Sequence, residues 1–544
     1  MIFNSLEFLV FLPVVLGLYF AIGPRLQNLL LLIAGYVFYG AWDVRFLYLV
    51  SVSTVLDFCT GLMIGNGRMT RRQRITPSLH VLSFAAVFLV VDWRAVSLDR
   101  GTLQIDWVRL STPTSFGLTV LGLTALIVGL AHALYPVFER MPEPKKRLFF
   151  LRCSLFGQLG MLGVFKYYNF FVDSADALAT RCGFSAQVLH LNLILPIGIS
   201  FYTFQTLSYV LDVYWGRMKP AEHLRDFALF VSYFPPLVAG PIERASHLLP
   251  RILGERKVTF DNFAKGAFLI AVGLVKKVAI ADGLAGTVAS VYDSSGAVGF
   301  TDVAVGTAVF AFQIYGDFSG YSDIASGVSL FFGIELLKNF DHPYFSINPS
   351  EFWRRWHISL SSWLRDYLYI PLGGNRGSEA RTYRNLMLTM VLGGLWHGAA
   401  WNFVLWGAYQ GLLLVAHRAI VGPGARPFTG SFLARLPRMA FFFVFICYGW
   451  LLFRASSFKR VVEFTRVLVS DFSDLGLHLK MPPASALFGL LVLGMIEVLQ
   501  FQTETPFFHL RLRAPVRGLL FAVVVLAFIL GSSNEAQQFI YFQF

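Results

Sequence analysis

Two histidines in this sequence have surroundings that could support proton transfer. His357 lies in the run from Phe352 to Ser359, and His397 lies in the run from Gly393 to Gly398. A neutral histidine suits the role of general base, because its ordinary pKa is near physiological pH and small shifts tune it. Both histidines fall in residues 313–401, which mix charged groups with apolar runs. Because such groups are costly in hydrocarbon, we interpret this stretch as a buried functional site.

His397 is predicted to lie at membrane depth. It stands eleven to twelve residues into the apolar run from Asn385 to Ala416. At about 1.5 Å per residue the imidazole would be roughly 17 Å deep, near the middle of a hydrocarbon core about 30 Å thick. A charged ring is disfavoured there, so we expect a neutral one. Gly394 and Gly398 would let another backbone approach. The alternative to a catalytic role is that His397 is a core histidine bound to a neighbouring carbonyl.

His357 is predicted to lie on a polar helix face. From Glu351 to Leu372 apolar side chains recur at steps of three and four, which predicts one face of a continuous helix. Arg354, His357 and Ser361 fall on a neighbouring face, so a cation, an imidazole and a hydroxyl would border a cavity or an interface. The alternative is an amphipathic helix lying in the membrane interface, with an incidental histidine.

Other chemistries fit the sequence less well. It contains no HExxH, CxxC, GxSxG or P-loop motif. A metal site of His342, His357 and His397 would match no known ligand spacing, so we expect no metal. The loop from Pro371 to Gly377 could present backbone amides to a phosphate, but its composition is more typical of a turn. The four scattered cysteines are interpreted as packing residues.

The elements that must position these groups are membrane helices. With 544 residues, 56% hydrophobic and only 14% charged, the chain is too apolar for a soluble protein. We therefore expect an all-α polytopic membrane protein of roughly 12 to 16 helical segments, each apolar run counted as spanning, broken or interfacial. The net charge of +13 suits basic loops at an anionic leaflet, or a polyanionic substrate. Membrane lipids are the expected surroundings, and no nucleic-acid partner is expected.

The N-terminus is predicted to lie outside the cytoplasm. The first apolar run, Leu6 to Ile22, lacks a basic leader and should remain as a membrane helix. After the third run, a loop with four arginines between Arg68 and Arg74 should face the cytoplasm. The loop from Glu139 to Arg152, with five basic and two acidic residues, should return there. A charge-balanced connection between Asp92 and Arg109 fits the outer face.

Two apolar stretches cannot be regular spanning helices. The run from Leu193 to Trp215 is interrupted by Pro196 and Gly198, and such a break is tolerated only inside protein or along a cavity. The run from Phe227 to Pro241 contains three prolines, so we expect a short re-entrant or interfacial segment.

Several motifs in one order resemble the membrane-bound O-acyltransferase (MBOAT) family, most closely its bacterial alginate O-acetyltransferase branch. The motifs are Leu195 to Gln205, Leu237 to Ile242, Asp317 to Asp323, Trp353 to Ser359 with Tyr367 to Asn375, and Gly394 to Gly398. The resemblance covers about residues 1–70 and 145–465. It implies an MBOAT-like bundle of many helices, with re-entrant or interfacial pieces, around a tunnel that crosses the membrane.

The resemblance also implies a reaction. Acetyl would pass from cytoplasmic acetyl-CoA to a hydroxyl on a periplasmic partner transferase or an exopolysaccharide, in the bacterial inner membrane. No tightly bound cofactor is implied, since acetyl-CoA is a substrate. His397 would be the catalytic histidine and general base, and His357 its neighbour in the active site.

Further residues are assigned to binding or support. Arg354 and Arg355, with Lys276 and Lys277, could attract the CoA phosphates at the cytoplasmic mouth. Ser361 is a further substrate-binding candidate on the His357 face. Asp317 and Asn339 are grouped with the substrate site, where we expect them to act as hydrogen-bonding groups inside the bundle.

The chain departs from the family pattern in two places. An added hairpin of two apolar runs occupies about residues 75–144, inside a catalytic domain predicted at 1–470. Residues 471–544 are predicted to form membrane helices of unmatched sequence. Three alternatives stay open: D-alanyl transfer to a teichoic acid from a carrier protein, a polysaccharide transporter, and a non-catalytic secretion scaffold. Against the transporter stands the lack of a repeated, inverted half.

Overall fold

The computed structural model describes residues 1–99, 102–184, 189–423, 428–532, 535 and 537–540. The protein is an all-α, multi-pass membrane protein, as predicted; its described residues include a single two-stranded antiparallel hairpin. Contacts divide the chain into a first unit, residues 1–238 and 242–257, and a second unit, residues 239–241 and 258–544. Both histidines belong to the second unit.

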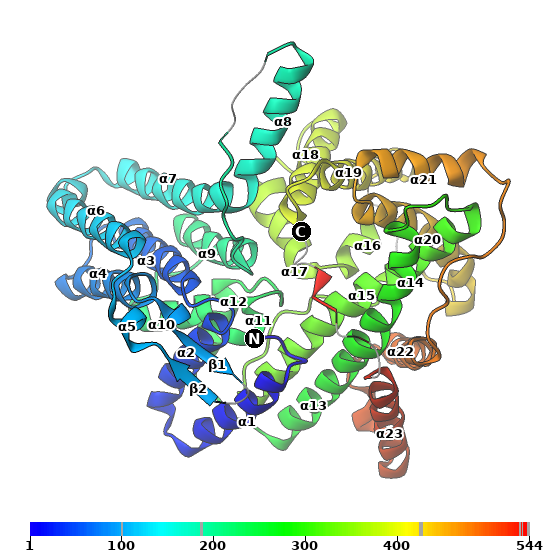
Figure 1. The fold of residues 1–544 in the computed structure, drawn as a ribbon, viewed down its shortest axis with the longest axis horizontal. Coiled ribbons are helices and arrows are strands. Elements are labelled where there is room, and N and C mark those ends of the chain that lie inside the picture. Colours follow the sequence, from blue (N-terminus) through cyan, green and yellow to red (C-terminus); the bar gives the residue numbers. More distant parts are fainter. Residues whose placement is uncertain (100–101, 185–188, 424–427, 533–534, 536, 541–544) are drawn as a thin grey trace. The chain divides into compact units, whose positions relative to one another are not determined.

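The first unit holds long apolar helices followed by shorter ones (Figure 1). Its α-helices are α1 (Leu6–Ala21), α2 (Pro24–Gly40), α3 (Phe46–Gly65), α4 (Arg71–Ala85), α5 (Trp107–Ser111), α6 (Ser115–Glu139), α7 (Glu143–Leu162), α8 (Tyr168–Arg181), α9 (Ile199–Tyr214), α10 (Leu224–Ser232), α11 (Phe234–Leu237) and α12 (Ala245–Leu253). Its other elements are η1 (Ala86–Val90), η2 (Trp93–Ala95), η3 (Gly163–Tyr167), β1 (Val96–Asp99) and β2 (Thr102–Ile105).

The second unit surrounds the long helix α15. Its α-helices are α13 (Phe260–Leu274), α14 (Gly283–Tyr292), α15 (Phe300–Phe331), α16 (Pro349–Arg355), α17 (Ile358–Leu364), α18 (Glu379–His397), α19 (Trp401–Val421), α20 (Phe432–Arg454), α21 (Phe458–Ser470), α22 (Ala484–Thr503) and α23 (Ala514–Gly531). Shorter turns are η4 (Val275–Asp282), η5 (Pro343–Phe345), η6 (Arg365–Tyr369) and η7 (Phe508–Arg511), of which η4 and η6 are π-helical.

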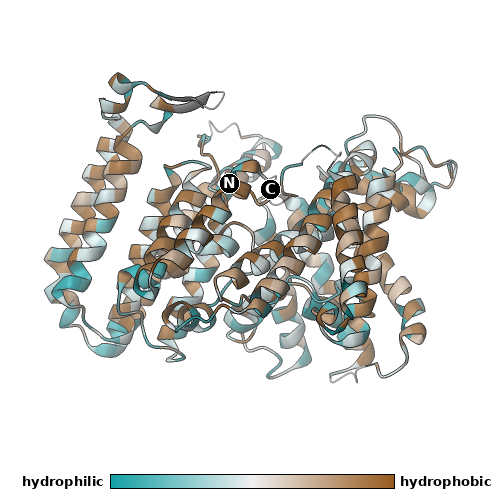
Figure 2. Ribbon diagram, turned by 90° about the horizontal axis from the view of Figure 1, so that it is seen from below, coloured by the Kyte–Doolittle hydropathy of each residue, from teal (hydrophilic) through white to brown (hydrophobic). Residues whose placement is uncertain are grey.

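Eight helical stretches in the described part of the chain are long and apolar enough to cross a membrane. They are Phe46–Gly65, Arg71–Val90, Trp107–Glu139, Glu143–Arg181, Trp401–Val421, Phe432–Arg454, Ala484–Thr503 and Ala514–Gly531. Apolar residues run along the long helices, and polar residues gather in the connections and at helix ends (Figure 2). This distribution is expected where helices face lipid and loops face water.

Residues 75–144 include two long helical arms, and that they are an addition to the family pattern stays a prediction. One arm is α4 continued by η1, and the other is α6. Between them, β1 pairs antiparallel with β2, with Val96 opposite Ile105, which the sequence did not predict. The prediction of a loop from Glu139 to Arg152 is wrong, because helix α7 already begins at Glu143. Pro144 in its first turn suits a helix start.

The two irregular stretches of the first unit are short helices inside protein. Gly198 has a φ of 76° and separates α9 from the segment before it, as the break at this position predicted. A side chain at Gly198 would come within 2.9 Å of the Leu237 carbonyl oxygen, so glycine is needed for this approach too. Helices α10 and α11 are buried almost throughout, in agreement with a short segment enclosed by protein.

Glycines bring α15 close to α13 and η4 in the second unit. A β-carbon at Gly320 would stand 2.8 Å from the Gly273 carbonyl oxygen, and one at Gly327 would stand 2.5 Å from that of Gly266. Small residues facing each other in this way let two helix backbones approach closely. The approach sets the side chains of η4 directly against α15.

The C-terminal helices belong to the core of the second unit. Both α22 and α23 pack on η4. A β-carbon at Gly531, the last residue of α23, would stand 2.5 Å from the Ala279 α-carbon, so the two backbones are in close contact there. The residues after 470 therefore pack against η4, which itself lies against α15, the helix that contains the Asp317 to Asp323 motif. The boundary at residue 470 was drawn where the resemblance to the family ends, and it stays a prediction.

Candidate active site

The helix predicted from Glu351 to Leu372 is interrupted at His357. Helix α16 ends at Arg355, α17 begins at Ile358, and His357 between them adopts the left-handed conformation with φ 43° and ψ 55°. The prediction of a continuous helix was therefore wrong, although its apolar stripe was real. A left-handed residue other than glycine is strained and persists only where its surroundings fix it.

Asn339 supplies the contacts that hold His357. The Asn339 side-chain oxygen lies 3.0 Å from His357 Nδ1 and accepts from the Ser359 hydroxyl at 2.9 Å. It also accepts from the Ser359 backbone N–H at 3.4 Å, and the Asn339 amide nitrogen donates to the Ser322 hydroxyl at 2.9 Å. A backbone N–H can only donate, so the amide oxygen is the acceptor and His357 Nδ1 carries the proton. The neutral ring then has its lone pair at Nε2.

The loop that carries Asn339 is fixed by charged groups. The Arg355 guanidinium bonds the Asp341 carbonyl oxygen at 3.0 Å and the Glu351 carboxylate at 3.0 Å. Hydrogen bonding from His342, followed by Lys338, holds the pKa of the Asp341 carboxyl well below its usual range. A backbone hydrogen bond also joins this loop to the start of α17, since the Ile358 N–H donates to the Asn339 carbonyl oxygen at 2.8 Å. Arg355 is thus a structural cation in this arrangement.

His397 is the last residue of α18, and the chain turns directly after it. The apolar run from Asn385 to Ala416 does not form one helix, because residues 398–400 separate α18 from α19. The predicted close approach at Gly394 is real: a β-carbon there would stand 2.3 Å from the Phe403 carbonyl oxygen and 2.9 Å from the Gly407 α-carbon. One at Gly398 would collide with the Phe403 ring instead of a backbone.

Aromatic rings enclose the His397 imidazole. Trp406 and Trp396 present their rings edge-on at centroid distances of 5.0 and 5.1 Å, and Phe453 does so at 5.6 Å. Asn402 fixes the Phe453 backbone, because its side-chain amide donates to the carbonyl oxygen at 3.4 Å. An apolar wall excludes water, so a proton accepted by His397 would remain close to the reacting groups.

The two histidines are neighbours. Their ring centroids lie 6.3 Å apart, and the rings are inclined by 60°. His357 is fully buried and His397 is 4% exposed. Burial disfavours the charged form of each ring, and a charge on one would oppose a charge on the other. The arrangement is two neutral imidazoles, one held in a defined tautomer, and it can accept and return one proton.

The other candidates on the His357 segment have different surroundings. Arg354 is exposed on α16 and interacts electrostatically with His417 of α19. Within the described residues Arg354 forms no ion pair, so its guanidinium can receive an anion. Ser361 is half-buried, and its hydroxyl donates to the Ile358 carbonyl oxygen at 3.3 Å.

Asp317, Lys276 and Lys277 form buried ion pairs. Lys276 lies 2.8 Å from Asp323, and Lys277 lies 2.8 Å from Asp317. Both lysines are less than a tenth exposed, so neither is placed at an open mouth. The Asp317 oxygens are engaged by Lys277 and by the Ile540 backbone N–H at 2.6 Å. These groups are therefore tied to protein atoms, in contrast to Arg354.

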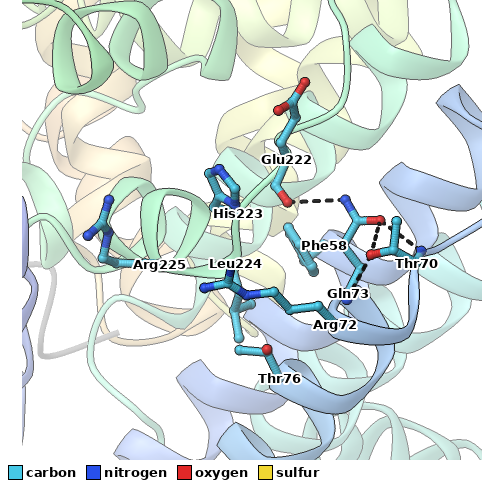
Figure 3. A pocket seen from close by; sticks show the side chains of 9 residues that line it. All are labelled: Phe58, Thr70, Arg72, Gln73, Thr76, Glu222, His223, Leu224 and Arg225. Atoms are coloured by element: carbon cyan, nitrogen blue, oxygen red, sulfur yellow. Dashed lines mark hydrogen bonds between the residues drawn. The ribbon is translucent and has the colours of Figure 1, made fainter.

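A separate pocket of about 530 Å³ lies in the first unit (Figure 3). Arg72 extends along this pocket beside Leu224. Arg225 and His223 stand on another side, and the Glu222 carboxylate is turned away from Arg72. The Glu222 carbonyl oxygen accepts from Gln73 at 3.2 Å and joins the two walls. Because Arg72 and Arg225 line this pocket, it could receive an anion, as the exposed Arg354 could in the second unit.

Sequence reasoning missed part of this site. Trp406 and Phe453 come from two further helices, and their apolar runs carried no signal beyond aromatic character. Asn339 had been grouped with the site, but its pairing with His357 could not be inferred across 18 residues. No group of three His, Cys, Asp or Glu side chains that could hold a metal occurs within the described ranges.

Comparison with known proteins gives consistent matches. The family model of the membrane-bound O-acyltransferases matches residues 222–458. The chain is 40% identical over 463 residues to a probable alginate O-acetylase of Pseudomonas aeruginosa, covering 84% of this chain and 73% of the relative. It is 37% identical over 512 residues to a probable alginate O-acetylase of Azotobacter vinelandii, covering 93% and 86%. A peptidoglycan O-acetyltransferase of Helicobacter pylori is 36% identical over 362 residues, covering 61% and 67%.

Proposed function

Because this chain belongs to the membrane-bound O-acyltransferase family and is an O-acyltransferase, we propose that it transfers acetyl from acetyl-CoA to a hydroxyl, with His397 as general base. The observation that carries the proposal is the pair of buried imidazoles 6.3 Å apart, with His357 held by Asn339. Similarity to named O-acetylases and to a peptidoglycan O-acetyltransferase supports acetyl as the group transferred.

His397 takes the proton of the acceptor hydroxyl as its oxygen attacks the thioester carbonyl. The same ring then returns the proton to the leaving sulfur, so one proton moves and none is consumed. The Trp406 and Phe453 rings keep water from the thioester and so limit hydrolysis. His357, fixed in position and tautomer, has a lone pair at Nε2 and therefore orients the acceptor by accepting a hydrogen bond from it.

The donor binds through its phosphates, and Arg354 is the residue we assign to them. It is exposed, lies on the helix that leads into His357, and pairs with no carboxylate in the described part of the chain. Of the four cations first considered, Arg355, Lys276 and Lys277 are engaged in ion pairs. Ser361, two turns further along, is retained as a weaker candidate for contact with the substrate.

The acceptor is a hydroxyl outside the cytoplasm, on an exopolysaccharide such as alginate or on a periplasmic partner transferase. Two relatives are named for alginate and one for peptidoglycan, and both are polymers of sugars. We place the protein in the bacterial inner membrane with its N-terminus in the periplasm, because the arginine-rich segment from Arg68 to Arg74, which includes the start of α4, favours the cytoplasm.

The test is transfer of labelled acetyl by purified protein in liposomes. We expect His397→Ala to lower the transfer rate by about 10² to 10⁴, the usual effect of removing a general base. His509→Ala is the matched control, since His509 is also a buried histidine of the second unit but stacks on Phe268.

Near full transfer by folded His397→Ala would remove His397 from the mechanism. No transfer by wild type from acetyl-CoA, but transfer from an acyl-carrier thioester, would replace the donor and favour the D-alanyl type of reaction. Transport of polymer without acylation would favour a transporter. A purified wild type that acylates nothing, together with normal acylation in cells whose protein has both histidines replaced, would favour a scaffold.

A further inference from the structure

The last described residues of the chain complete the surroundings of a buried ammonium group. Lys277 Nζ lies 2.8 Å from Asp282, 2.8 Å from Asp317 and 3.0 Å from the Gln537 carbonyl oxygen. An ammonium has three donors, and these are three acceptors. Leaving one donor of a buried charge without an acceptor is costly, so the Gln537 backbone contributes to keeping Lys277 inside the protein.

The same segment is fixed again three residues later. The Ile540 backbone N–H donates to the second Asp317 oxygen at 2.6 Å, while the first oxygen faces Lys277. The Ile540 side chain is 6% exposed and belongs to the main hydrophobic cluster of the second unit. Residues 537–540 are therefore held against η4 and α15.

Between these two anchors, Phe539 reaches the support of His357. Its ring is 5% exposed and lies 6.1 Å from Phe318 and 5.3 Å from Tyr321, centroid to centroid. Phe318 in turn presents its ring to the His357 imidazole at 4.6 Å, inclined by 85°. Phe318 is fully buried, so its position depends on the rings that surround it.

We propose that residues 537–540 are a positioning element of the active site, with Phe539 acting on His357 through Phe318. This inference rests on the proposed role of the two histidines. The Lys277–Asp317 pair anchors the segment, which gives both residues a function other than substrate contact. Phe539 itself touches no reacting group in this scheme and is a positioning residue.

The contacts to His357 come from two sides and have different physical characters. Asn339 fixes the ring through hydrogen bonds at Nδ1, which set its tautomer. Phe318 fixes the ring through packing, which sets its tilt. A hydrogen bond alone leaves rotation about its own axis, so packing is needed to aim Nε2. Phe318 is the ring nearest to the imidazole among Phe318, Phe340 and Trp396. Loss of Phe539 opens space behind Phe318 and releases that tilt.

The test compares Phe539→Ala with Phe508→Ala in the acetyl-transfer assay. Phe508 is also a buried aromatic of the C-terminal region, 4% exposed, and it packs on Phe268. We expect both variants to lower the thermal midpoint, but only Phe539→Ala to lower kcat, by roughly 10- to 100-fold. The KM for acetyl-CoA should stay within about twofold, because the donor phosphates are held elsewhere.

Phe539→Leu keeps an apolar side chain in the core and serves if the alanine variant does not fold. It should lower kcat without a large change in thermal midpoint. Wild-type kcat in Phe539→Leu, or equal kcat in Phe539→Ala and Phe508→Ala, overturns the inference. His357→Ala separates the two proposals: if it is fully active the proposed role of His357 fails, and if it is inactive while Phe539 variants are normal, only the positioning role fails.

Discussion

Replacing Asn339 by alanine tests whether His357 works as an oriented, neutral ring. In the wild type the Asn339 side-chain oxygen accepts from His357 Nδ1 at 3.0 Å and from the Ser359 hydroxyl at 2.9 Å. Alanine removes this acceptor from these two donors and from the Ser359 backbone N–H, which lies farther away at 3.4 Å, in a buried site. The imidazole then loses the contact that fixes its tautomer, and Nε2 is no longer the defined lone-pair nitrogen.

The magnitude follows from the two shorter of the lost hydrogen bonds, those from His357 Nδ1 and the Ser359 hydroxyl. A buried donor left without an acceptor costs about 1–3 kcal/mol, so two such donors lower the free energy of unfolding by roughly 2–6 kcal/mol. Only the bond to His357 bears on the reaction. If the 1–3 kcal/mol of that bond is lost from the interaction that the oriented His357 makes in the transition state, kcat falls by roughly 5- to 150-fold. The KM for acetyl-CoA should change little.

The assay is labelled acetyl transfer in liposomes, combined with thermal unfolding of the same preparations. Asn385→Ala is the matched control, because Asn385 is also buried and donates to the Gly374 carbonyl oxygen at 3.0 Å. It should lower stability and leave kcat nearly unchanged. Equal kcat in Asn339→Ala and Asn385→Ala would refute the assigned role of the Asn339–His357 bond.

Three further predictions concern other parts of the second unit. Gly394→Val should cost more than about 2 kcal/mol of unfolding free energy, since a β-carbon there stands 2.9 Å from the Gly407 α-carbon; an unchanged thermal midpoint would contradict this. Arg354→Glu should raise the acetyl-CoA KM about tenfold, whereas Arg72→Glu should not, and the reverse result would assign the phosphates to the first-unit pocket. The lowered pKa of Asp341 contributes stability above its unfolded value of about 3.9 that is lost as pH falls toward the folded pKa. Asp341→Asn should therefore reduce the thermal midpoint at pH 7 more than at pH 3.

Some of the site could be predicted because its signals are local. His357 and His397 stand out as ionisable groups inside apolar sequence, and their cost in hydrocarbon marks them whatever the fold. The break at Gly198 followed from residue chemistry, since it lies two residues after a proline and adopts positive φ. The close approach at Gly394 could be predicted for the same reason, because a missing side chain is visible in the sequence.

Other features could not be predicted, because they depend on contacts distant in the chain. The turn at His357 has no glycine to mark it. The histidine is held in that conformation by the Asn339 side-chain oxygen, which accepts from His357 Nδ1 and from the Ser359 hydroxyl. Lys277 looked like an exposed cation, but glycine-mediated packing of η4 on α15 sets it beside Asp317.

The sequence by itself determined the membrane class, most of the long helices and the two histidines, because hydropathy and side-chain chemistry act over short distances. Only the tertiary structure decided that the imidazoles lie 6.3 Å apart and that His357 has a defined tautomer. It also decided that Phe539, near the far end of the chain, packs on Phe318. Each of these depends on helix packing, which joins residues that no local pattern relates.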